Sequence, residues 1–247
     1  MTLPKILKPK KSPNLIRLGR DNDGGYLVSE KTVNESKTLI SFGILDDCSF
    51  ENDFKKINPV SIFCYDNTVN KSFWIKKIYN DLGAAIYNFN WAFLKNSLKK
   101  YFEFKDFFKK KDNYLTISTI KNGSIRKIIK DNNFKAPIFF KIDIEGSEYR
   151  ILDELIEFQD LTCGLAIEFH DLDLHLQKVE NFVKNFGLSL THIHPNNYGA
   201  LDQKNDPTVI EMTFEKFPDF KSENLILPNE LDQPNDPNNK DISLHFE

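Results

Sequence analysis

The chain has 247 residues, of which 40% are hydrophobic and 28% charged, so it is long enough to bury a sizeable core in one domain. Its net charge of −3 and isoelectric point near 6.0 give no support for nucleic-acid binding through phosphate contacts. No run of 18 apolar residues occurs, and the cysteines lack CxxC spacing, so we expect no membrane span, disulfide framework or zinc ribbon.

The N-terminal segment is basic but lacks the apolar region of a secretory signal, and we expect it to be a loosely tethered arm. Cys48, Cys64 and Cys163 are expected to be buried thiols in a reducing, cytoplasmic environment. These features are compatible with a homo-oligomer but do not predict one.

Strand-like and helix-like stretches alternate from about residue 37 to residue 215, a pattern typical of βαβ units and a mainly parallel sheet. Apolar and alternating runs predict strands over Thr38–Gly43, Val60–Tyr65, Ala84–Phe89, Ile138–Ile144, Gly164–Phe169, Leu188–Ile193 and Thr208–Phe214. Apolar residues at helical spacing predict helices over Gly123–Asn132, Ser147–Phe158 and Leu172–Phe186. The predicted fold class is α/β, with a seven-stranded, mostly parallel sheet covered by helices on both faces.

Two regions depart from this alternation. Residues 89–113 are rich in aromatic residues and lysines and are interpreted as a helical insertion or a substrate lid. From Asn224 onward the chain is rich in Pro, Asn and Asp and is interpreted as an extended C-terminal tail. Residues 1–247 are otherwise expected to form a single domain.

The first predicted strand ends at Gly43, and acidic residues and a helix expected from near Ser49 follow it. Glycine permits close approach of a ligand to the backbone, although a plain turn is an equally good interpretation. The GxGxxG fingerprint is absent, which disfavours dinucleotide binding. Asp66 ends the next strand 23 residues later and is expected to bind ribose hydroxyls, with an Asx turn formed with Asn67 as the alternative.

The predicted strand Ile138–Ile144 places Lys141, Asp143 and Glu145 on one face by strand alternation. Open α/β sheets bind ligands outside the carboxyl ends of their strands, so both carboxylates are candidate site residues. Either carboxylate could instead cap the following helix, a role that suits Glu145 better than Asp143.

The next two strands end in histidines and polar residues. Glu168 and His170 share one face, His192 and His194 share another, and the loop that follows contributes Asn196 and Asn197. A lone histidine is usually structural, but His170 and His194 are predicted at comparable strand ends near Asp143, which favours a site role. Zn or Mn could also be bound here, with ligands from Asp143, Glu168, His170 and His194, but no recognised metal motif is present and no metal is assigned.

Asp23-Gly24-Gly25, before the sheet, is expected to turn a hairpin. The neighbouring Arg20 could reach an anionic group of a substrate.

Taken together, four segments resemble the FkbM-like S-adenosylmethionine-dependent methyltransferases over about residues 16–215. They are Asp23-Gly-Gly-Tyr26, Ser41-Phe-Gly-Ile-Leu-Asp-Asp-Cys-Ser-Phe-Glu51, Lys141-Ile-Asp-Ile-Glu-Gly-Ser-Glu148 and Ile167-Glu-Phe-His170. The His192–Asn197 segment and Glu211 look like a subgroup associated with sugar O-methylation in bacterial surface polysaccharides.

The resemblance implies a Rossmann-like class I methyltransferase sheet whose last strand is antiparallel, with S-adenosylmethionine across the first strand ends. Phe42 and Gly43 would line its methionine and ribose parts, and Asp66 with Asn67 would hold the ribose. Asn88 would meet the adenine, and Asp143 would lie beside the sulfonium. The first turn departs from the family, since Leu45 stands where many methyltransferases place a second glycine.

The expected activity is O-methylation of a sugar hydroxyl, on a nucleotide-linked sugar such as a heptose for capsule or another surface polysaccharide. Such a hydroxyl must lose its proton, and His194 is the first candidate for the base and His170 the second, oriented by Asp143 or Glu168. The candidate substrate-binding residues are Arg20, Glu145, Glu168, His192, Asn196 and Asn197. The alternatives are a metal-dependent hydrolase that uses the HxH and carboxylate residues, and a non-catalytic Rossmann-like binding module.

Overall fold

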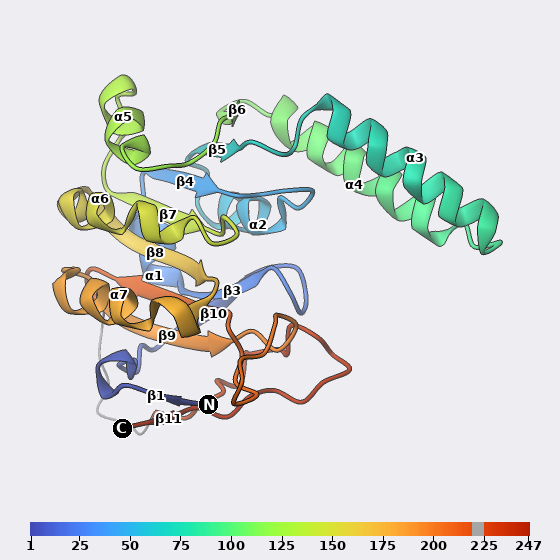
Figure 1. Cartoon of the computed structure of the whole chain (residues 1–247). Coiled ribbons are helices and arrows are strands. Elements are labelled where there is room, and N and C mark those ends of the chain that lie inside the picture. The colour runs from blue at the N-terminus through green and yellow to red at the C-terminus, as the bar shows by residue number, and fades with distance from the viewer. Residues whose placement is uncertain (219–224) are drawn as a thin grey trace.

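The computed structural model describes residues 1–218 and 225–247, which build an α/β structure around one central sheet (Figure 1). Its strands are β4 (Thr38–Phe42), β5 (Ser61–Asp66), β6 (Asn113–Ile117), β7 (Ile138–Ile142), β8 (Thr162–Phe169), β9 (Ser189–Pro195) and β10 (Ile210–Glu215). They lie in the order β6-β5-β4-β7-β8-β10-β9. Only β10 runs antiparallel to its neighbours in this sheet, so the predicted seven-stranded, mostly parallel sheet with an antiparallel last strand is confirmed.

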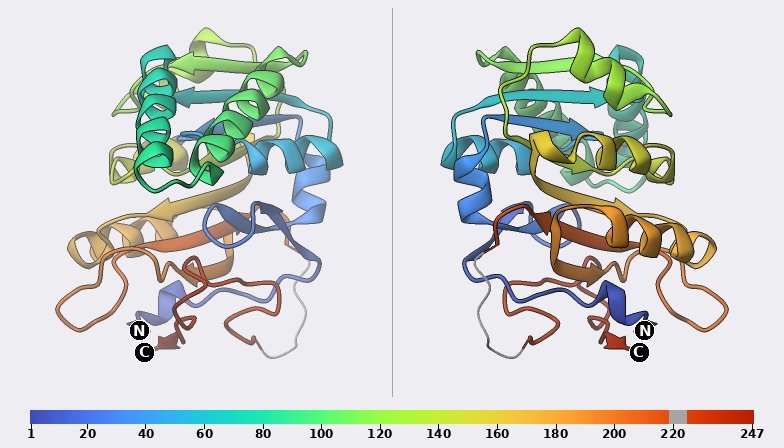
Figure 2. Two further views of the ribbon diagram at one scale, coloured as in Figure 1. Left: turned by 90° about the vertical axis from the view of Figure 1, so that its right-hand side faces the viewer. Right: turned by 90° about the vertical axis from the view of Figure 1, so that its left-hand side faces the viewer.

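Helices cover both faces of the sheet, because both faces of its inner strands are apolar. Along β7, Phe140 and Ile142 point into a core beneath α5 (Ser124–Asp131), α6 (Leu152–Glu157) and α7 (Leu172–Asn185). Phe139 points the other way, into a second core beneath α1 (Glu30–Glu35) and α2 (Ser49–Ile57). The two views of Figure 2 show these two layers of helices on opposite sides of the strands.

The third predicted strand, Ala84–Phe89, is wrong. Residues 84–87 form the last turn of α3 (Lys71–Tyr87), which begins where the Asn70 side chain accepts a hydrogen bond from the backbone N–H of Phe73. A short apolar run fits a strand and a helix turn equally well, and here the helix is the longer continuous element. The true third strand is β6, an edge strand with several exposed residues that pairs in parallel with β5.

A second long helix, α4 (Ala92–Lys109), follows α3 and packs against it as an antiparallel hairpin. The pair projects from the end of β5 beyond the carboxyl edge of the sheet (Figure 1). The aromatic, lysine-rich stretch at 89–113 is therefore mostly helical, and its role as a lid stays a prediction.

A smaller hairpin precedes the sheet. β2 (Leu15–Gly19) and β3 (Gly25–Ser29) pair in antiparallel fashion, which places the turn where Asp23-Gly24-Gly25 predicted it. β3 is buried throughout and lies against β10, so its side chains reach the interior.

The two ends of the chain lie side by side (Figure 1). β1 (Thr2–Leu3) pairs in parallel with β11 (His245–Phe246), and Leu7 in the short 3-10 helix η1 (Lys5–Leu7) is fully buried. The expectation of a loosely tethered N-terminal arm is therefore wrong. The predicted start of the C-terminal tail, Asn224, lies outside the described residues.

The remaining predicted elements lie close to their expected bounds. The helix expected over Ser147–Phe158 is divided into the 3-10 helix η2 (Glu148–Arg150) and α6, and a further 3-10 turn, η3 (Gln159–Leu161), precedes β8. Cys48, Cys64 and Cys163 are buried free thiols, as expected. Within the described ranges, every helix is too short or too polar to cross a bilayer.

Candidate functional site

A cavity of about 420 Å³ opens at the carboxyl ends of β4, β5, β6 and β7. Eight carboxylate residues contribute to its lining: Asp23, Asp46, Asp47, Glu51, Asp66, Asp143, Glu145 and Glu168. The lining residues that can carry a positive charge are Arg20, Lys141 and His170. This excess of negative charge favours a cationic ligand and opposes the entry of phosphate groups.

Gly43, at the end of β4, is needed for the two central strands to meet at the cavity. Its φ is +75°, and a Cβ at this position would lie 1.6 Å from the carbonyl oxygen of Asp143. No other residue fits so close to a neighbouring backbone. The glycine thus serves the approach of the β4 and β7 ends, rather than only the approach of a ligand.

The carboxylate of Asp66, at the end of β5, organises the turn after β4. Its Oδ2 accepts hydrogen bonds from the backbone N–H groups of Ile44 (3.0 Å) and Leu45 (2.9 Å). Its Oδ1 accepts from the backbone and hydroxyl of Thr68 and from the backbone of Val69. Burial disfavours the charged form, but these donors outweigh it and lower the pKa of Asp66. Five donors already fill the roughly four acceptor positions of a carboxylate, so a ribose hydroxyl would have to replace one of them.

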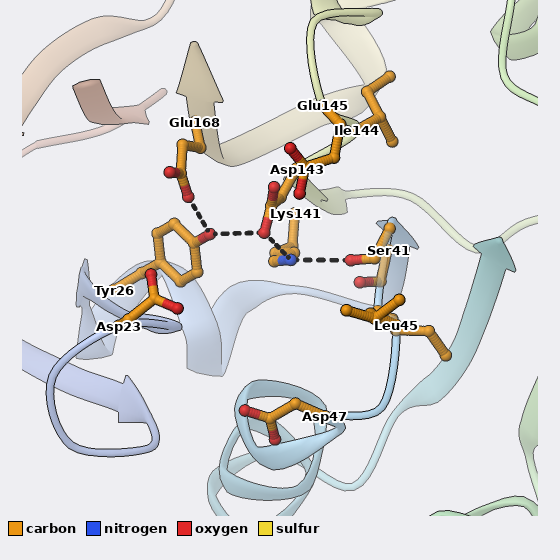
Figure 3. Close-up of polar contacts among 12 residues, drawn as sticks. Asp23, Tyr26, Ser41, Leu45, Asp47, Lys141, Asp143, Ile144, Glu145 and Glu168 are labelled. Carbon is orange, nitrogen blue, oxygen red and sulfur yellow. Dashed lines mark hydrogen bonds and ion pairs between the residues drawn. The ribbon is translucent and has the colours of Figure 1, made fainter. Parts of the chain in front are cut away.

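A continuous chain of polar contacts crosses the cavity floor from β8 to β4 (Figure 3). The Tyr26 hydroxyl lies 3.0 Å from Glu168 Oε2 and 3.1 Å from Asp143 Oδ2. Lys141 Nζ lies 3.2 Å from the same Asp143 oxygen and donates to the carbonyl of Gly43 at 2.8 Å. Burial opposes the charged form of Lys141, but the carboxylates around it outweigh burial and raise its pKa.

Tyr26 lies between two carboxyl groups, which limits the hydrogen bonds that it can donate. A tyrosine has one hydroxyl hydrogen, so it can donate to Asp143 or Glu168 but not to both. Burial, and then the charges of Asp143 and Glu211, raise the pKa of Glu168 well above its ordinary value. A protonated Glu168 can donate to the Tyr26 oxygen while Tyr26 donates to Asp143.

His170 follows β8 and lies among three carboxylates. Its Nδ1 is 3.1 Å from Oε1 of the fully buried Glu148, and its Nε2 is 3.4 Å from Glu145 Oε2 and 3.9 Å from Glu168 Oε1. Burial lowers the pKa of His170, but the hydrogen bond to Glu148 and the charges of the nearby carboxylates outweigh burial and raise the pKa to about 9. His170 is therefore the one histidine of the expected set that lines the cavity.

The same residues include the arrangement best suited to a metal ion in the described ranges. Ligand atoms of Asp143, Glu145 and His170 lie within 4.8 Å of one another. Because Glu148 holds Nδ1 of the imidazole, Nε2 faces this group of oxygens. Glu145 is a non-glycine residue at a φ of +52°, a conformation that usually carries a backbone cost.

Glu51, from α2, brings an unpaired atom to the cavity. Its Oε1 accepts a hydrogen bond from the Ser41 hydroxyl, whereas its buried Oε2 has no partner. Burial raises the pKa of Glu51, and the charge of Lys141 opposes that rise. An orphaned carboxyl oxygen in the lining is an acceptor that a bound ligand can satisfy.

His192 and His194 do not reach the cavity. His194 Nε2 lies 3.0 Å from Asp241 and its Nδ1 lies 3.6 Å from Glu211, while His192 Nε2 lies 3.0 Å from Asp232. Both rings thus hold the C-terminal segment against β9. The expected convergence of His194 with Asp143 is wrong. His194 contacts Glu211 and Asp241 instead, and the sequence pattern around His194 does not predict the contact with Asp241.

The two asparagines after β9 also act within the protein. Asn196 donates to Glu168 Oε1 at 2.9 Å, which positions the carboxyl group bound to Tyr26. The Asn197 side chain donates to carbonyls of the C-terminal segment and accepts from the backbone N–H of Asp236. Asn196 therefore lies one contact away from the cavity, and Asn197 is a structural clamp.

Three further predicted residues lie elsewhere than expected or are already engaged. Phe42 is fully buried in the core beneath α5 and α6 and does not line the cavity. Asn88 caps the C-terminus of α3 on the projecting hairpin, so its expected contact with adenine is wrong. Arg20 does line the cavity, where it pairs with Asp23 and Asp47.

Several lining residues were missed by sequence reasoning. Glu51 and Asp46 had no assigned role, and Ser118 and Thr119 after β6 take the place expected for Asn88. Tyr26 was missed as well; it contacts the lining carboxyl groups of Asp143 and Glu168 from behind. Lys141, by contrast, stands out as a lysine within an apolar strand. No sequence signal pointed to Tyr26, because its position depends on how the β2–β3 hairpin packs against the rest of the protein.

No protein-family model matches the chain, and no curated protein matches it. Solved structures match it over about three quarters of its length. An rRNA methylase from Streptococcus thermophilus is 12% identical, with 75% of this chain and 90% of that chain covered and a TM-score of 0.38. M. jannaschii TYW2 in complex with AdoMet is 10% identical, with 76% and 74% covered and a TM-score of 0.38. The fibrillarin pre-rRNA processing protein of Methanococcus jannaschii is 6% identical, with 74% and 68% covered and a TM-score of 0.40. The likeness is one of fold alone.

Proposed function

We propose that the chain is an S-adenosylmethionine-dependent O-methyltransferase. The observation that carries the proposal is the acidic cavity at the carboxyl ends of β4 to β7, in a seven-stranded sheet with one antiparallel strand. S-adenosylmethionine carries a sulfonium and an ammonium group, and eight lining carboxylates suit such a cation. The orphaned Oε2 of Glu51 offers an acceptor for the ammonium group.

The strand ends suggest how the cofactor would be held. The β5 end, with Asn67 beside the saturated Asp66, suits the ribose, and Ser118 and Thr119 after β6 suit the adenine. The β4 turn at Gly43 suits the methionine part, and Asp143 lies on the side where the sulfonium would be. Bound there, the cofactor supplies an electrophilic methyl group to an acceptor.

The acceptor needs a base, and we propose His170 for that role in preference to His194. His170 faces the cavity, and Glu148 fixes its tautomer so that Nε2 is the atom that takes the proton. Glu145 lies 3.4 Å from that atom and stabilises the imidazolium that results. Asp143, held by Tyr26 and Lys141, orients the acceptor hydroxyl.

We propose a sugar hydroxyl as the acceptor, as the resemblance to the sugar O-methylating subgroup implies, with a role in the cytoplasm in making capsule or another surface polysaccharide. The exposed carboxyls of Glu145 and Asp23, both in the lining, can accept hydrogen bonds from neighbouring sugar hydroxyls. If the sugar is a heptose linked to a nucleotide, its diphosphate lies outside the acidic lining, because Arg20 and Lys141 are already paired with carboxylates.

The proposal is tested by transfer of a radiolabelled methyl group to a panel of free sugars, nucleotide-linked sugars and RNA. We expect label in a sugar fraction, lost in His170→Gln and kept in Asp153→Asn, a control on the exposed face of α6. Label in RNA alone would keep the methyltransferase and overturn the sugar acceptor.

A metal-dependent hydrolase is the second candidate, favoured by the close grouping of Asp143, Glu145 and His170. It predicts tight binding of Mn²⁺ or Zn²⁺ and hydrolysis that a chelator stops, without any binding of S-adenosylmethionine. A binding module predicts cofactor binding without transfer to any acceptor.

A further inference from the structure

The far end of the α3–α4 hairpin exposes a group of large apolar side chains. We call residues 82–94 the tip segment; it contains no charged residue. Phe89 is 93% exposed, Tyr87 85% and Trp91 60%, and Ile86 and Phe93 are more than half exposed. The tip segment lies at the point of the hairpin farthest from the sheet (Figure 1). Solvent exposure of this many neighbouring aromatic side chains marks an interaction surface.

The hairpin does not need these side chains for its own packing. Its seam is built nearer the sheet, where Trp74 on α3 contacts Tyr101 and Phe104 on α4, with ring centroids 5.4 and 5.1 Å apart. The Ser97 hydroxyl also bonds to Asp81 across the two helices. The tip aromatics are therefore available to a partner without loss of the hairpin.

The charge of the hairpin is opposite to that of the whole chain. Residues 71–109 contain eight lysines, no arginine and three acidic residues, a net charge of +5 in a chain whose net charge is −3. Lys95 and Lys99 are exposed on the first turns of α4, directly behind the tip segment, and Lys76 is exposed on α3. An uncharged aromatic segment with lysines behind it is complementary to an anionic lipid surface. At such a surface tryptophan and tyrosine lie in the headgroup region, and lysines pair with the anionic lipids.

We propose that the tip segment inserts into the interfacial region of an anionic lipid membrane and anchors the protein there. The arrangement favours lipid over nucleic acid, because the aromatics form the point of a projecting element and the charges lie behind them. Binding sites for single-stranded nucleic acid instead place cations and stacking rings along one groove. A second copy of the chain could offer its own tip segment, but that contact would bring together two hairpins that each carry a net charge of +5.

Membrane attachment would bring the cavity close to the lipid surface. Lys77 and Lys100, on the two helices, both bind Asp46 in the cavity wall, at 3.3 and 2.9 Å. Ten residues separate Lys77 from Tyr87, which corresponds to about 15 Å along a helix. The hairpin thus links the cavity wall to the tip over a short, helical distance. This inference does not depend on the identity of the reaction.

The test is sedimentation of the full chain with vesicles of phosphatidylcholine alone or mixed with phosphatidylglycerol. We expect binding to the mixed vesicles only, and at least tenfold weaker binding for Tyr87→Ser/Phe89→Ser/Trp91→Ser. The matched control is Leu174→Ser/Tyr198→Ser/Leu201→Ser, which removes three large exposed side chains elsewhere and should bind as the parent does. Lys95→Glu/Lys99→Glu should weaken binding while it leaves every tip aromatic in place.

Tryptophan fluorescence gives a second readout. The chain has two tryptophans, of which Trp74 is buried and Trp91 exposed, so a blue shift on adding vesicles reports insertion of Trp91. No blue shift, or equal sedimentation of the tip and control variants, would overturn the proposal. Tip variants that lose RNA binding, or that convert a dimer into a monomer, without any vesicle binding in the parent would overturn it in favour of those partners.

Discussion

Replacement of His194 with glutamine tests whether this residue is a clamp for the C-terminal segment. Burial disfavours the charged imidazolium, but the hydrogen bonds to Asp241 and Glu211 outweigh it and raise the pKa of His194 from 6.5 to about 10. A histidine whose pKa is higher in the folded protein than in the unfolded chain stabilises the fold fully below pH 6.5. That contribution falls as the pH rises and is lost above pH 10.

The expected magnitude follows from proton linkage. One unit of pKa difference corresponds to about 1.4 kcal/mol, and between about pH 6 and about pH 9 the His194 contribution falls by about 3 kcal/mol. His194 and its partners are all mostly buried, so solvent screening removes little of this. The free energy of unfolding of the parent should therefore fall over this range by about 3 kcal/mol more than that of His194→Gln.

The assay is urea denaturation followed by circular dichroism at both pH values. His245→Gln, at an exposed position in β11, is the control and should follow the parent. Equal pH dependence in the parent and His194→Gln would refute the clamp. Loss of methyl transfer by a His194→Gln protein that is still folded at pH 7 would return His194 to the role of base.

Three further predictions follow from the cavity. Gly43→Ala should destabilise the protein by at least about 2 kcal/mol in urea denaturation, since Gly43 combines a positive φ with a position where a Cβ would clash with backbone. The control Gly83→Ala, at a position with open space around it, should not destabilise the protein. Equal stability of the two variants would contradict the close approach of β4 and β7. Because His170 must be neutral to accept a proton and its pKa is about 9, kcat/KM for transfer should rise with pH up to about 9. His170→Gln should abolish that rise, and a rise confined to acidic pH would point to a carboxylate base. Transfer should survive EDTA, because His170 already pairs with Glu145 and Glu148; activity lost to EDTA and restored by Mg²⁺ would assign a metal to that cluster.

Most strands of the sheet could be predicted because strands buried on both faces of a parallel sheet are continuous apolar runs in the sequence. Ile138–Ile142 and Thr38–Phe42 are apolar runs that end in Asp143 and Gly43, so both their position and the polar edge of the sheet were readable. Ala84–Phe89 has the same apolar character but belongs to a helix, since short apolar runs do not distinguish the two. The true third strand lies at an edge and is only partly buried, which weakens its signal.

The candidate site was predictable only where its residues follow strand ends. Asp143, Glu168 and His170 meet at the cavity as expected. His192 and His194 share the strand-end pattern, but their partners Asp232 and Asp241 lie 40 or more residues later, and nothing local reveals that pairing. The contact of Tyr26 with two carboxyl groups likewise depends on tertiary packing.

The most direct test of the proposed function is calorimetric titration of the protein with S-adenosylmethionine. We expect one site per chain with an affinity tighter than about 1 mM, which corresponds to about −4 kcal/mol. Asp66→Asn should weaken this binding at least tenfold, because the turn that Asp66 organises forms the wall of the cavity, and Asp153→Asn should not. A folded parent protein that shows no binding at millimolar cofactor would contradict the assignment.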